Sequence, residues 1–132
     1  MADSRLNIKF GWLWIFFGIV SGMILGMFAF NGPLQLPPEF MDYSSLPRRF
    51  LRLAHISFLG LGFLNWMYGI SAKTLSLKID KNISYILIFG SITMPLILIL
   101  SAFFEPIKYA LIIPAGSIFL GVLMFCKALC KD

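Results

Sequence analysis

Charged residues, cysteine and histidine are scarce in this sequence of 132 residues. Charged side chains make up 13% of it, about half of the roughly 25% found in soluble domains, so the composition is not that of a soluble domain. The two cysteines, Cys126 and Cys130, stand at positions i and i+4, which a regular helix does not bring into disulfide geometry, and we expect free thiols. The single histidine excludes a bis-histidine haem site within one chain.

Motifs of soluble enzymes and of nucleic-acid-binding proteins are also missing. The sequence contains no catalytic triad, no phosphate-cradling loop and no pair of carboxylates suited to acid–base catalysis. It has no basic module interleaved with aromatic residues, so nucleic acid is not an expected partner. Too few ligand residues are present for a metal site. We therefore expect a protein that is not an enzyme and holds no metal.

Four long stretches contain no Lys, Arg, Asp or Glu. They cover residues 10–38, 53–72, 82–104 and 109–126. A helix needs about 20 apolar residues to cross a hydrocarbon core of roughly 30 Å, and each stretch is close to that length or longer. The sequence therefore predicts an all-α integral membrane protein, an antiparallel bundle of four transmembrane helices forming the single domain 1–132. The predicted spans are residues 10–31, 50–71, 83–104 and 109–129.

Polar and proline-rich segments separate the predicted spans. Residues 1–9 are expected to form a short polar tail, and residues 32–47 a proline-rich loop at the membrane interface. Ser45 followed by Pro47 predicts an N-cap and a first turn that start the second helix slightly before its apolar part. Residues 105–108 predict a tight turn, after which Pro114 gives either a mild kink or the true first turn of the fourth helix.

Proline also interrupts the third span, which Asp80 or Asn82 can cap at its start. Pro95 lies near its middle and lacks the amide that would bond the Ser91 carbonyl. We therefore expect a kink at Pro95, with the hydroxyl of Ser91 or Thr93 helping to satisfy the backbone.

Four spans place both termini on one side of the membrane. Lys and Arg are more numerous on that side than on the other, so the positive-inside rule predicts cytoplasmic termini. The margin is small, and inverted or dual topology remains an alternative. Tryptophan and tyrosine residues near the span ends, Trp14 among them, are expected to form interfacial belts.

A stripe of glycines runs along the first span. Gly18, Gly22 and Gly26 recur every four residues, and Gly11 lies close to the same stripe. Small residues allow helix backbones to approach closely, which is the usual device for helix association in lipid. We expect this stripe to pack against a neighbouring helix of the same chain, and a homodimer seam is the alternative.

Two polar residues lie inside the second span. His55 and Asn65 are separated by about 15 Å at 1.5 Å per residue. Polar groups at membrane depth are functional candidates because exposing them to lipid costs several kcal/mol. The structural interpretation is that each makes hydrogen bonds to another helix. Alternatively, His55 ligates a haem together with Met94 or a partner's ligand, or a polar path from His55 to Asn65 serves a small permease.

Arg48, Arg49 and Arg52 lie in the first turn of the predicted second helix. They are expected to snorkel outward, where they anchor the helix end or contact lipid headgroups or another anion. No acidic residue lies within any span, whereas proton- and cation-coupled transporters usually place a carboxylate there. By size and span number the chain resembles the small multidrug transporters, but that family's glutamate in the first span has no counterpart in residues 10–31.

Taken together, these features favour a multi-pass membrane protein with a structural or accessory role. We expect its partners to be the lipid bilayer and either further copies of itself or a larger membrane complex. No cofactor is expected under this hypothesis. The alternatives are the haem-linked protein that uses His55 and the small permease that uses His55 and Asn65.

Overall fold

The computed structural model describes residues 2–29, 32–77 and 80–130, and the described chain is helical with short connections. The elements are α1 (Ala2–Met27), η1 (Pro38–Phe40), α2 (Leu46–Thr74), α3 (Lys81–Phe103), η2 (Glu105–Leu111) and α4 (Ile112–Leu129). The prediction of an all-helical chain is confirmed. Four helices are long and apolar enough to cross a membrane, and they comprise Ser4–Met27, Leu46–Thr74, Lys81–Phe103 and Glu105–Leu129.

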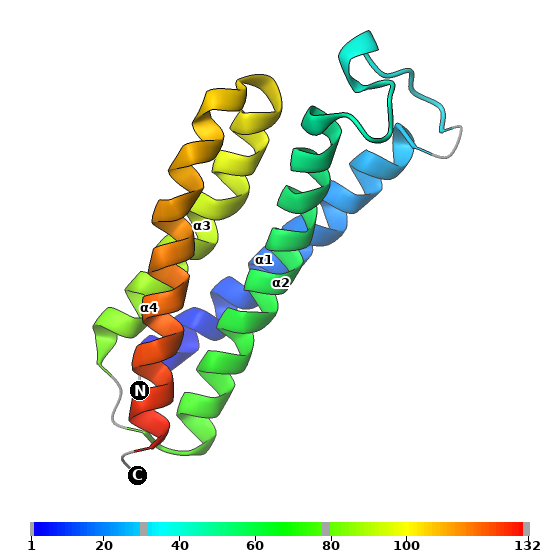
Figure 1. The fold of residues 1–132 in the computed structure, drawn as a ribbon. Coiled ribbons are helices and arrows are strands. Elements are labelled where there is room, and N and C mark those ends of the chain that lie inside the picture. Colours follow the sequence, from blue (N-terminus) through cyan, green and yellow to red (C-terminus); the bar gives the residue numbers. More distant parts are fainter. Residues whose placement is uncertain (1, 30–31, 78–79, 131–132) are drawn as a thin grey trace.

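Successive long helices alternate in direction (Figure 1). α1 begins and α4 ends at the same end of the molecule, while η1 and the loop that carries it lie at the opposite end (Figure 1). α2 packs against both α1 and α3, and α4 packs against α3. This order makes α2 and α3 the inner pair of helices.

The first helix differs most from its predicted bounds. It begins at Ala2, so most of the predicted polar tail is helical, and it ends at Met27. The early start has a packing reason, because Asn7 is fully buried against α2. The early end is set by a turn in which the Leu34 amide bonds the Met27 carbonyl. Gly32 is required there, since a Cβ at this position would lie 2.2 Å from the Met27 carbonyl oxygen.

The starts of the other helices largely follow the sequence signals. α2 has Ser45 at its N-cap and Pro47 in its first turn, although the Ser45 hydroxyl makes no capping hydrogen bond. Asp80 caps α3 by accepting a hydrogen bond from the Asn82 amide, as predicted. The turn after α3 continues as η2, so Pro114 falls in the true first turn of α4.

Pro95 lies inside the continuous helix α3, and the carbonyl that it frees has a partner. The Trp14 indole N–H of α1 donates to the Ser91 carbonyl oxygen at 2.9 Å. The Ser91 and Thr93 hydroxyls bond the backbone carbonyls of Leu87 and Phe89, so Trp14 and not either hydroxyl bonds the carbonyl that Pro95 frees. Trp14 is therefore an interhelical donor, and the interfacial belts stay a prediction. The expected kink remains a prediction.

Buried apolar side chains form two clusters. One lies at the end that carries η1 and joins the loop, α2 and α3, through Phe40, Phe50, Ala54, Leu98 and Ala102. The other lies where α2 meets the start of α3 and the end of α4, through Tyr68, Ile83 and Leu87 with partly buried residues of α4. The polar residues of α2 that the sequence singles out lie beside the first cluster and between the two clusters.

Candidate functional site

The glycine stripe of α1 packs against α2 within the chain. A Cβ at Gly18 would lie 2.5 Å from a Leu59 side-chain carbon, and a Cβ at Gly22 would lie 2.7 Å from Cε1 of His55. Backbone contact continues toward the N-terminus, where Gly11 and Gly62 face each other. Gly26 differs from the others, because a Cβ there would meet no atom within 4 Å. Gly26 instead lines a pocket.

His55 is held by a hydrogen bond across the α1–α2 contact. Its Nδ1 lies 3.0 Å from the Ser21 hydroxyl, which itself donates to the Gly18 carbonyl at 2.8 Å. A hydroxyl has one proton to donate, so the network assigns the Nδ1 proton to His55, with Ser21 as acceptor. In the neutral ring Nε2 is then the unprotonated nitrogen. This is the interhelical contact that the structural interpretation of His55 expects.

Asn65 belongs to a separate, fully buried polar junction among three helices. Its amide nitrogen donates to the Ser91 hydroxyl at 2.7 Å and to the Leu61 carbonyl at 2.9 Å. Its amide oxygen accepts from Asn7 of α1 at 2.8 Å. All three polar side chains are inaccessible to solvent. The junction therefore ties α1, α2 and α3 together.

Asn7 was not recognised from the sequence because it lies in the predicted polar tail. A signal for it existed, since Asn7 stands four residues before Gly11 and so extends the glycine stripe by one turn. His55 and Asn65 belong to separate hydrogen-bond networks, His55 with Ser21 and Asn65 with Asn7 and Ser91. Between them along α2, Leu59 packs on Gly18 and Gly62 packs on Ile15.

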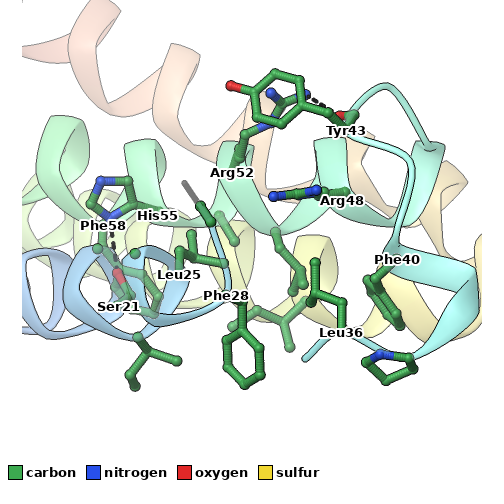
Figure 2. Close-up of a pocket in the computed structure, with 18 of the residues that line it drawn as sticks. Ser21, Leu25, Phe28, Leu36, Phe40, Tyr43, Arg48, Arg52, His55 and Phe58 are labelled. Atoms are coloured by element: carbon green, nitrogen blue, oxygen red, sulfur yellow. Dashed lines mark hydrogen bonds between the residues drawn. The ribbon is translucent and has the colours of Figure 1, made fainter. Parts of the chain in front are cut away.

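A pocket of about 530 Å³ opens beside His55 (Figure 2). This volume lies within the range of about 300–1,000 Å³ that is usual for ligand sites. Its wall is built by the end of α1, the start of α2, the loop with η1 and the end of α3, and most of it is apolar. Apolar side chains that line it include Leu25, Phe28, Leu36, Phe58, Ile99 and Phe103.

Cationic side chains line one part of the pocket. Arg48 and Arg52 share the ring of Tyr43, with guanidinium carbons 4.9 and 4.1 Å from its centroid (Figure 2). Each arginine makes one long hydrogen bond to a loop carbonyl, at 3.4 Å for Arg48 and 3.3 Å for Arg52. Among the residues that the structure describes, the one ion pair joins Lys108 and Glu105. Neither pocket arginine therefore has a carboxylate in contact within the described chain.

One acidic residue of this loop, Asp42, is hydrogen-bonded by a neighbour in the sequence. The Asp42 carboxylate accepts hydrogen bonds from the backbone amide and the hydroxyl of Ser44. These bonds, with a smaller contribution from the charge of Arg48, hold the pKa of Asp42 below its usual value. Asp42 therefore stays ionised at neutral pH without pairing directly with either pocket arginine.

The comparisons with known proteins give no family. No protein-family model, curated protein or solved structure matches this chain. The site must therefore be interpreted from its own chemistry. Within residues 2–29, 32–77 and 80–130, no group of three or more His, Cys, Asp or Glu residues could hold a metal ion.

The arrangement is chemically that of an amphiphile site. Apolar walls exclude water, two guanidinium groups supply planar donors for an anion, and the Ser21–His55 pair lies at the other end of the α2 segment that lines the pocket. Arg49 lies on the same helix but does not line the pocket. Of these three neighbouring arginines, Arg48 and Arg52 thus line the pocket and Arg49 does not.

Proposed function

We propose that the protein is a multi-pass integral membrane protein, an antiparallel four-helix bundle with both termini in the cytoplasm. Its role is that of a non-enzymatic structural or accessory subunit, either in a homo-oligomer or in a larger membrane complex. The proposal rests on the exposed apolar surface of α4.

α4 is the helix whose span is least buried within the chain. Its large apolar side chains face outward, with Ile112 77% and Phe119 65% exposed. Gly116 has no atom within 4 Å of the position a Cβ would take, so a second backbone can approach closely there. Such a surface is compatible with lipid and with a partner helix, and a small residue among large ones favours the partner helix.

The interior polar groups support a structural role. Asn65 bonds both Asn7 and Ser91, and the Ser117 hydroxyl of α4 donates to the Ile86 carbonyl of α3 at 2.7 Å. Interhelical hydrogen bonds in membrane proteins contribute about 0.6 kcal/mol each on average. These side chains therefore serve to hold the four helices in register.

The proposal is tested by extracting the protein from membranes in mild detergent. We expect a particle heavier than one chain by light scattering, and oxidation of the exposed Cys126 and Cys130 in native membranes to crosslink copies of α4 or to join α4 to a partner. A carbonate-extractable protein, or a monomer without any partner in detergent and in crosslinked membranes, would contradict the proposal.

The haem-linked alternative is favoured by one observation, the contact of Nδ1 of His55 with the Ser21 hydroxyl, because protonation of Nδ1 leaves Nε2 as the ligating nitrogen. Ring orientation by a hydrogen bond at the other nitrogen is typical of metal-bound histidines. Under this alternative the purified protein would show a Soret band that His55→Ala removes. A colourless protein after expression with excess haem would eliminate it.

A further inference from the structure

We propose that the pocket beside α2 binds a phospholipid with an anionic headgroup. One acyl chain lies in the apolar part, and the phosphate is bound by Arg48 and Arg52. The inference requires the chain to lie in a bilayer, as proposed above, but it does not depend on any oligomer or accessory role. Its two halves rest on different observations, one for the chain and one for the headgroup.

The apolar part has the dimensions of one acyl chain. Along α2 the pocket extends from Arg48 to Phe58, which is about 15 Å at 1.5 Å per residue. Half of a roughly 30 Å hydrocarbon core is also about 15 Å, the depth of one leaflet. Gly26 presents no side chain to the pocket, and because a Cβ there would meet no atom within 4 Å, it leaves room along the α1 wall. An apolar chain is therefore the occupant that fits this volume.

The arginine end carries an excess of positive charge. α2 has no acidic residue in its first turn, yet Arg48, Arg49 and Arg52 all lie near its N-terminus. The partial positive charge of a helix N-terminus adds to that of these side chains. The charge of Asp42 acts on Arg48 and offsets part of this excess, but the carboxylate is hydrogen-bonded to Ser44 and not to an arginine. An anion bound here would offset an otherwise unfavourable concentration of like charge.

The chemistry of the two arginines selects a phosphate. A guanidinium group offers parallel donors that match phosphate oxygens, and each pocket arginine uses one donor in a long bond to a loop carbonyl. The Tyr43 ring contacts both guanidinium groups and so holds them on the same side of the pocket (Figure 2). A zwitterionic lipid would bring a choline charge toward the same cluster and bind less tightly.

The test measures lipid binding to the purified full-length protein by native mass spectrometry. Phosphatidylglycerol and phosphatidylcholine with identical acyl chains are compared, and we expect about tenfold tighter binding of phosphatidylglycerol. Glycerol phosphate, which lacks chains, and a fatty acid of the same chain length are the further arms, and both should bind more weakly than phosphatidylglycerol. Equal affinity for the two phospholipids would overturn the proposal, as would equal or tighter binding of either further probe.

Matched variants assign the effect to the pocket. Arg48→Gln with Arg52→Gln should abolish the phosphatidylglycerol preference, whereas Arg49→Gln, an exposed neighbour outside the pocket, should keep it. Gly26→Leu should fill the chain site and lower affinity about tenfold. Gly60→Leu is its control, because Gly60 also faces open space but does not line the pocket. Equal effects within either pair would refute the site.

The same samples separate this inference from the proposed role. A membrane-inserted protein that shows no lipid preference refutes the lipid site and leaves the structural role intact. A protein that prefers phosphatidylglycerol but is monomeric and without partners refutes the structural role alone. Circular dichroism of each variant confirms that the helices are retained before binding is compared.

Discussion

Ser91 is the residue at which three helices meet. Its hydroxyl accepts from Asn65 of α2 and donates to Leu87, and its carbonyl accepts from Trp14 of α1. The carbonyl is available because Pro95 has no amide to offer it. The hydrogen bond that α3 lacks at Pro95 thus provides an acceptor for α1. In apolar surroundings each of these groups would be costly without its partner.

Asn65→Ala should lower the unfolding free energy by more than the loss of side-chain volume alone would. The substitution leaves the buried Asn7 amide and the Ser91 hydroxyl without their Asn65 contacts. Leaving a buried polar group unsatisfied costs about 1–3 kcal/mol of unfolding free energy. Denaturation in detergent followed by circular dichroism measures the loss. Gln35→Ala, at an exposed loop position, is the control, and an equal change in both variants would contradict the role of the junction.

Trp14→Phe tests the contact to the proline-freed carbonyl. Phenylalanine keeps an aromatic ring against Phe10 and Phe58, but it removes the N–H donor to the Ser91 carbonyl. We expect a loss of about 1–3 kcal/mol in unfolding free energy, because a buried carbonyl is left unpaired. Trp12→Phe is the matched control, since Trp12 is 59% exposed. Comparable melting temperatures for the two variants would show that this hydrogen bond contributes nothing.

At the scale of elements, the α1–α2 contact depends on the absence of side chains. Gly22→Ala would place a Cβ 2.7 Å from Cε1 of His55, so the ring would have to shift and its contact with Ser21 across the two helices would be disturbed. Overpacking of this kind costs about 1–3 kcal/mol. Gly26→Ala, which meets no atom within 4 Å, should be neutral or stabilising by up to about 1 kcal/mol. Thermal unfolding of the pair measures the difference, and the opposite order of stability would refute the intrachain contact.

The existence of four long helices could be predicted because each follows from a property of its own segment. Long uncharged stretches, the Asp80 cap and Pro47 in a first turn are all local signals. The early start of α1 could not be predicted in the same way. It depends on the hydrogen bond between Asn7 and Asn65 of α2, which is a tertiary contact that the polar composition of residues 2–9 does not indicate.

For the candidate site too, some features could be predicted from the sequence and others could not. His55 and the arginines stand out in the sequence because ionisable groups are rare beside apolar stretches. Their common pocket does not, because its walls include Leu36 from the loop and Ile99 from α3. The sequence also gives no means of separating Arg49 from its neighbours. That separation depends on which face of α2 meets the folded loop.

At the scale of the whole molecule, the proposed orientation is testable with a native thiol. Cys130 is exposed at the end of α4, on the side where α1 begins. We expect a membrane-impermeant maleimide to label it in inverted vesicles and not from outside intact cells. Gln35→Cys, in the loop at the opposite end, should show the reverse pattern in a Cys126→Ser, Cys130→Ser background. Labelling of both sites from both sides would indicate dual topology.

One further consequence follows from the place of Phe40. This residue of η1 is 7% exposed and packs with Phe50, Ala54 and Leu98, so its aromatic ring helps to hold the loop that forms one wall of the pocket. If a lipid binds as proposed above, we expect its release to be faster when the Phe40 ring leaves this cluster. Under that proposal the packing of Phe40 affects how long the lipid stays bound.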